Sequence, residues 1–210
     1  MIRPLILLLL FTGTCCGQGT IKDSTIISTQ SIISDTVNNS PNKAFNEKTD
    51  LSQIDQSDAK VDVRLYTLHS LSNTKTVRRL FLIDTSWNAT EFDEWNQPVT
   101  IKKYKLKAEP SFDSLLLRLL SFNIMILPNQ SELQSKMHKY TDDTSGGYRT
   151  ERRMSVVDGE GYTIEIKIGN KFRVYEFDNP GPYSKFYDNV SELKDYLNIV
   201  ETFDKYLKRE

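Results

Sequence analysis

Hydrophobic residues follow two different periods along the chain from residue 61 onward. Alternation of apolar and polar residues over 61–68 predicts a half-buried strand, and similar patterns predict strands over 77–84 and 99–106. The polar, acidic stretch 85–98 contains both tryptophans and is interpreted as a connection. The first part of the domain is therefore expected to form three strands.

The period then changes to that of helices. Pro110 and Ser111 form a helix start, and leucines follow at helical spacing. Residues 129–132 have the pattern of a capping box, which predicts a second helix over 129–140. A last helix from about residue 189 has one apolar stripe, formed by Leu193, Tyr196, Leu197, Val200, Phe203 and Leu207.

Three more strands are predicted between these helices. A short strand is expected over 152–157, followed by a turn at 158–161. Alternating isoleucines over 162–168 and the returning segment 171–177 then predict a β-hairpin around Gly169-Asn170.

The predicted order of elements is βββ-αα-βββ-α. This order is typical of an α+β fold, with a single antiparallel sheet and helices packed on one face. The expected domain covers residues 61–210. Residues 18–60 are rich in Ser, Thr, Asn and Gln and are predicted to be a disordered spacer, because they have little apolar surface to bury.

The first seventeen residues have the pattern of a signal peptide. Arg3 precedes an apolar run over 5–11, and small residues follow. The run is shorter than the roughly 20 residues of a transmembrane helix, so no transmembrane span is expected. The sequence thus predicts a secreted or periplasmic protein.

Both cysteines of the chain, Cys15 and Cys16, lie at the end of this signal. Cleavage after Gly17 would give a soluble protein that begins at Gln18 and has no cysteine. The alternative is a lipoprotein acylated at Cys15 or Cys16 and held at the membrane, although residues 12–15 form a poor lipobox. In either case no intramolecular disulfide is expected.

Composition argues against several classes of function. The formal net charge is −1, with 27 basic and 28 acidic residues, so nucleic acid is not an expected partner. His69 and His138 are the only histidines and belong to no ligand-spaced cluster, so neither a metal site nor a Ser-His site is predicted. No phosphate-binding loop is present, no cofactor is expected, and no catalytic residue is assigned.

The predicted hairpin carries one group of candidate binding residues, Glu165, Arg173 and Tyr175. A three-residue turn would place all three on one face, whereas a two-residue turn would place Arg173 and Tyr175 beside the isoleucines. The alternative to a ligand contact is a structural cross-strand cluster.

Aromatic residues in a proline-bounded loop form the second group of candidates. Tyr183, Phe186 and Tyr187 are expected to be exposed there, where aromatic side chains favour protein interfaces or stacking on sugars.

Several short motifs resemble a family of uncharacterised exported proteins of the Bacteroidota. They are the Gly-Gln end of the signal, Leu127-Pro128-Asn129-Gln130, Asp158-Gly159, the strand 162–166, the segment 169–175 and Asn179-Pro180. The resemblance covers about residues 127–207. It implies a bacterial cell envelope and no particular functional residue.

These observations favour a non-catalytic interaction domain of the cell envelope, with a protein or a glycan as partner. A small hydrolase of envelope polymers that uses two carboxylates, such as Glu165 and Glu176, is the alternative. An inhibitor or immunity-type protein is a third possibility, which would differ from the first in the identity of its partner.

Overall fold

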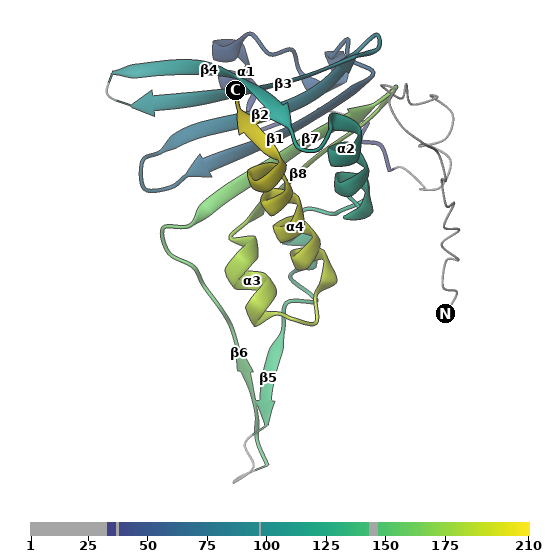
Figure 1. The fold of residues 1–210 in the computed structure, drawn as a ribbon. Coiled ribbons are helices and arrows are strands. Elements are labelled where there is room, and N and C mark those ends of the chain that lie inside the picture. The colour runs from purple at the N-terminus through teal and green to yellow at the C-terminus, as the bar shows by residue number, and fades with distance from the viewer. Residues whose placement is uncertain (1–32, 37, 97, 143–146) are drawn as a thin grey trace, which may run out of the picture.

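The computed structural model describes residues 33–36, 38–96, 98–142 and 147–210. A seven-stranded antiparallel sheet forms its centre, in the spatial order β8-β7-β1-β2-β3-β4-β9 (Figure 1). The strands are β1 (Val61–His69), β2 (Thr74–Ile83), β3 (Ser86–Asn96), β4 (Val99–Ala108), β7 (Glu160–Ile168), β8 (Lys171–Asp178) and β9 (Leu207–Arg209).

Helices cover one face of this sheet, which we call the helical face (Figure 1). They are α2 (Phe112–Ser121), α3 (Pro180–Phe186) and α4 (Ser191–Tyr206). The side chains of Val63, Leu65, Ile164 and Ile166 from the sheet, together with Phe203 from α4, belong to the hydrophobic core on this face. This core is the main apolar contribution to folding.

The other side of the sheet, which we call the polar face, is covered in part by residues 38–57. This N-terminal cover contains α1 (Lys43–Thr49) and a 3₁₀ turn, η1 (Ile54–Gln56). Phe45 and Leu51 pack there against Tyr66, Val77 and Phe92 in a second, smaller core. The described structure therefore has a layer on each face of the sheet.

The α+β class with a large antiparallel sheet is confirmed, but the predicted order and the packing on a single face are not. The stretch 85–98, predicted to be a connection, contains strand β3. Its polarity does not prevent a strand, because Glu91 pairs with Arg78 on β2 and with Arg209 on β9. Ion pairs replace apolar alternation in this strand.

The predicted helix over 129–140 is also wrong. The capping box is present, but it begins only a 3₁₀ turn, η2 (Gln130–Leu133). The chain then enters β5 (Lys139–Asp142), which pairs with β6 (Arg149–Arg152) in a separate two-stranded sheet that extends away from the body (Figure 1). The strand expected over 152–157 thus lies earlier in the chain.

The prediction of a disordered spacer over 18–60 does not hold for residues 38–60, and the folded part begins before Val61. Ile54 is fully buried and Phe45 nearly so. The polar composition of this segment led to the wrong prediction because the N-terminal cover is held to the sheet largely by hydrogen bonds to buried charged side chains. The predicted signal peptide with Cys15 and Cys16, and residues 18–32 of the predicted spacer, lie outside the described residues.

Candidate functional site

Four charged side chains form a cluster on the polar face, beneath the N-terminal cover. Arg64 on β1 lies opposite Arg79 on β2 and opposite Glu165 on β7. Asp62 is on the same face of β1, two residues before Arg64. With two cations and two anions the cluster is electrically balanced, which lowers the cost of burying it.

Asp62 joins the two arginines. Arg64 donates to both of its carboxylate oxygens at 3.2 and 2.8 Å, and Arg79 does the same at 3.0 and 2.8 Å. The hydroxyl of Ser57 donates to Asp62 as well, at 2.6 Å. Burial disfavours the carboxylate, yet the bonds from Arg79 and Arg64 together hold the pKa of Asp62 below its usual range.

Glu165 is fully buried and receives fewer charged donors. Arg64 Nη1 lies 3.1 Å from its Oε2, the hydroxyl of Tyr66 donates to the same oxygen at 3.0 Å, and Ser40 donates to Oε1. Burial raises the pKa of Glu165, because it outweighs the attraction of Arg64.

The cluster fastens the cover to the sheet. Ser40 and Ser57 of the cover bond to its carboxylates, and Arg64 donates to the carbonyl of Ser52 at 2.7 Å. Glu165 lines neither of the two cavities described below. The cluster is therefore structural, and its role is to order a segment that has few apolar residues.

The predicted group of Glu165, Arg173 and Tyr175 is divided between the two faces. The hairpin has a two-residue turn, so Glu165 lies opposite Val174, while Arg173 and Tyr175 lie opposite Ile166 and Ile164 on the helical face. Of the two registers considered, the one with isoleucine neighbours is thus correct. The three residues do not form a common binding site.

Arg173 and Tyr175 are both engaged within the fold. Arg173 pairs with Asp35 at 3.1 Å and donates to the carbonyl of Leu127 at 2.6 Å. Tyr175 is fully buried beside Tyr196, and burial raises the pKa of its phenol.

The second predicted group, Tyr183, Phe186 and Tyr187, is not an exposed loop. The first two belong to α3 and are partly buried against the main core. Tyr187 is 3 % exposed, packs edge-on against Phe186 with ring centroids 4.8 Å apart, and accepts a hydrogen bond from the backbone of Met154. These aromatic residues stabilise the packing of α3.

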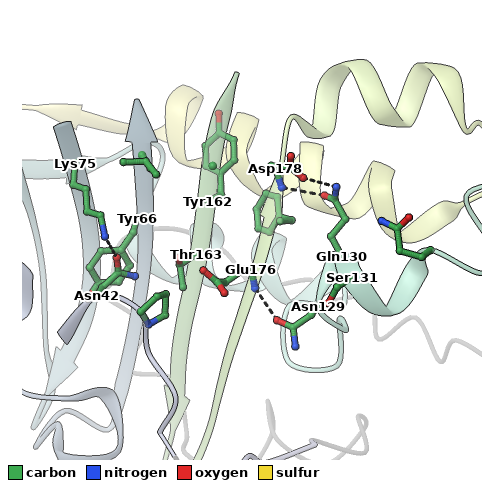
Figure 2. Close-up of a pocket in the computed structure, with 15 residues that line it drawn as sticks. Asn42, Tyr66, Lys75, Asn129, Gln130, Ser131, Tyr162, Thr163, Glu176 and Asp178 are labelled. Carbon is green, nitrogen blue, oxygen red and sulfur yellow. Dashed lines mark hydrogen bonds between the residues drawn. The ribbon is translucent and has the colours of Figure 1, made fainter. Parts of the chain in front are cut away.

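A groove crosses the polar face between the N-terminal cover and η2 (Figure 2). It consists of two adjoining cavities of about 520 and 510 Å³ that share Pro41, Asn129, Ser131 and Glu176. Each volume lies within the roughly 300–1,000 Å³ of small-molecule sites. Hydroxyl, amide and charged side chains line both cavities, but the exposed surface of the first is mainly apolar and that of the second mainly polar, so a ligand of this groove would be a polar molecule with some apolar surface.

Side chains on one wall of the groove are held by the backbone of β8. The N–H of Glu176 donates to Asn129 Oδ1 and that of Asp178 to Gln130 Oε1, both at 3.0 Å (Figure 2). Gln130 in turn donates to the carboxylate of Asp178. Asn129 also bonds to Glu132, which fixes η2 against the strand. This wall is therefore rigid.

The opposite wall contains Asn42, which is 2 % exposed. Its Oδ1 accepts a hydrogen bond from Lys75 Nζ at 2.8 Å, whereas its Nδ2 has no partner among the described residues. In Figure 2 the oxygen turns to Lys75 and the nitrogen toward the side of Thr163. An unpaired buried donor is unfavourable by about 1–3 kcal/mol, and a ligand acceptor would remove that cost.

The sequence contained a signal for only part of this site. The capping-box pattern identified Asn129 and Glu132, although not the bonds of Asn129 and Gln130 to β8. Asn42 and Lys75 are distant from η2 in the sequence, so only the topology brings them to the same groove.

Among the described residues, no group of three or more His, Cys, Asp or Glu is placed to hold a metal ion. Within the same residues no helix combines the length and the apolar character needed to cross a bilayer. Comparison of the chain with family models, with curated proteins and with solved structures gave no match.

Proposed function

We propose that the protein is an exported, non-catalytic binding domain of the cell envelope that takes a polar ligand in the groove of the polar face. The buried, unpaired Nδ2 of Asn42 at the wall of a cavity of about 520 Å³ is the observation that carries the proposal. Export rests on the pattern of residues 1–17.

Rigidity of the groove supports a binding role. Asn129 and Gln130 are fixed by the backbone of β8, and Asn42 is fixed by Lys75. Polar groups that are already in place lose little conformational entropy when a ligand binds, which favours affinity.

The arrangement of carboxylates gives no support to the hydrolase alternative. Glycoside hydrolysis uses two carboxylates that flank one bond across a cleft. Glu165 is fully buried and bonded to Arg64, whereas Glu176 is exposed and lines the groove. The pair named from the sequence therefore does not flank a common cleft.

A pair of matched variants tests whether the groove binds. Ser131 is exposed, lines both cavities and makes no side-chain bond among the described residues, so Ser131→Trp should block the groove without unfolding the protein. Ser135→Trp, in the exposed turn that follows, lies outside both cavities and is the control.

Each protein is titrated with a mixture of free tripeptides and with a mixture of neutral oligosaccharides, followed by amide chemical shifts in ¹H–¹⁵N NMR spectra. Binding of either mixture by the wild type and Ser135→Trp, with loss in Ser131→Trp, is the expected result. Absence of shifts with both mixtures, or equal shifts in Ser131→Trp, would overturn the proposal.

A further inference from the structure

One row of residues crosses the groove from a cation to an anion. Lys75 on β2 lies opposite Leu68 on β1, Leu68 lies opposite Gly161 on β7, and Gly161 lies opposite Asp178 on β8. All four residues line the first cavity. The centre of the row is uncharged, and its two ends have opposite charges.

The Lys75 end offers two neighbouring hydrogen-bond donors. Lys75 Nζ makes one side-chain bond among the described residues, to Asn42 Oδ1, and no carboxylate neutralises it there. Asn42 Nδ2 is the unpaired donor of the same amide group. An ammonium group beside an amide donor is suited to a carboxylate, since charge-assisted hydrogen bonds are the strong ones.

The β8 end offers an unpaired anion. The carboxylate of Glu176 is exposed, lines both cavities and has no hydrogen-bond or ion-pair partner in the part of the chain that the structure describes. Asp178, two residues further along the same face, is bonded to Gln130 and Asn179. Glu176 is therefore the carboxylate available to a ligand cation.

Gly161 leaves the middle of the row open. A Cβ atom at this position would come within 3.8 Å of the Leu68 side chain, so the two occupy adjoining space on the floor. Without that atom the space above the strand is free for a ligand backbone.

We propose that the ligand of the groove is a short zwitterionic peptide, with its carboxylate at Lys75 and Asn42 and its free ammonium at Glu176. This inference rests on the proposed function and names its ligand class. The amide side chains of Asn129 and Gln130, which are bonded to β8, and that of Gln134 on the same turn line the groove at the Glu176 end and can bond to peptide groups there.

The separation of Lys75 and Glu176 sets the size of the peptide. The two residues are three strand spacings apart across the sheet and two residues apart along it, which corresponds to about 16 Å between their Cα atoms, because adjacent strands lie about 4.8 Å apart and a strand rises about 3.3 Å per residue. The side chains of Lys75 and Glu176 extend into this span and shorten it. A tripeptide reaches at most about 11 Å when extended, so about three residues fit.

Blocked peptides provide the test. The wild type is titrated with free tripeptides, with their N-acetylated and C-amidated forms, and with neutral oligosaccharides. Each blocked form is expected to bind at least about tenfold more weakly than the free peptide, because it loses one charge-assisted contact.

Two substitutions test which residue binds each end of the peptide. Glu176→Gln should weaken binding of the free peptide about tenfold and leave the affinity for the N-acetylated peptide unchanged. Lys75→Gln should also weaken binding of the free peptide about tenfold and leave the affinity for the C-amidated peptide unchanged. Glu201→Gln, on an exposed position of α4 outside both cavities, is the charge-matched control and should bind as the wild type does.

The outcomes separate the two proposals. Binding of neutral oligosaccharides, or equal affinity for free and blocked peptides, would overturn the zwitterion assignment and leave the groove as a binding site. Unchanged affinity in both charge variants would also overturn it. Failure of every probe to bind the wild type would overturn the proposed function as well.

Discussion

Replacement of Arg64 by Met should cost a large part of the stability of the fold. Arg64 is fully buried, donates to both carboxylates of the cluster and bonds to the carbonyl of Ser52. Without it, Arg79 is the only cation bonded to the two carboxylates, because Lys167, opposite Asp62 on β7, donates to the carbonyl of Ser57 instead, and the buried cluster loses much of its charge compensation. Removal of one partner of a buried ion pair costs about 3–5 kcal/mol, whereas the whole free energy of unfolding of a domain is roughly 5–15 kcal/mol.

Urea unfolding at pH 7, followed by tryptophan fluorescence, measures this loss. With a slope of about 2 kcal/mol per molar urea, a loss of about 4 kcal/mol lowers the midpoint by about 2 M. Arg153→Met is the control, because Arg153 is exposed and pairs with Glu151 at the surface. It should change stability by no more than about 0.5 kcal/mol.

A second substitution shows whether unpaired charge is the cause. Arg64→Met combined with Glu165→Gln leaves one carboxylate and one arginine, so the charges balance again. The double variant should be more stable than Arg64→Met alone, so the effects of the two substitutions on stability should not be additive. A loss below about 1 kcal/mol in Arg64→Met, or a double variant that is less stable than the single one, would refute the electrostatic account.

Two further predictions concern pH and the main core. Glu165 has a raised pKa when folded, so its contribution to stability is fully present below the unfolded value of about 4.5 and is lost as the pH rises through the folded value. The free energy of unfolding of the wild type relative to Glu165→Gln should therefore increase as the pH is lowered from 7 toward 5; denaturant titrations that show the opposite slope would contradict the assignment. Phe203→Ala removes a fully buried ring and should cost about 3–5 kcal/mol, whereas Glu201→Ala on the exposed side of α4 should cost less than about 0.5 kcal/mol. Thermal unfolding compares the two, and equal melting temperatures would mean that the buried side of α4 is misassigned.

The elements with a strong period could be predicted from the sequence. The β7–β8 hairpin and α4 were identified because their apolar residues contact the main core, as periodicity assumes. Most of the apolar stripe assigned to α4 is buried, with Leu197 only partly so. Local patterns are reliable where apolar burial determines the structure.

The elements that polar contacts hold were missed. β3 has Glu91 in a buried position, paired with arginines that come from β2 and β9. The N-terminal cover depends on Arg64, Asp62 and Glu165, which are distant in sequence. Hydropathy does not show which charges pair in the fold. From the sequence alone, neither segment can therefore be distinguished from a loop or a disordered region.

The candidate site was missed for a related reason. The length of the hairpin turn decided which face Glu165, Arg173 and Tyr175 occupy, and a change of one residue reverses it. The groove is formed by β2, β8, η2 and the cover together. Apart from the capping box at 129–132, its residues therefore share no motif along the chain.

Strand β8 lies at the edge of the sheet, where a row of unpaired N–H groups would normally invite a further strand. Its outward N–H groups donate instead to side-chain oxygens of Ser34, Asp35, Asn129 and Gln130. At the other side of the sheet, β9 covers only the end of β4, and exposed lysines follow the remainder. Side chains thus saturate one edge of the sheet and charged side chains flank the other, so neither edge is suited to pairing with a strand of another chain.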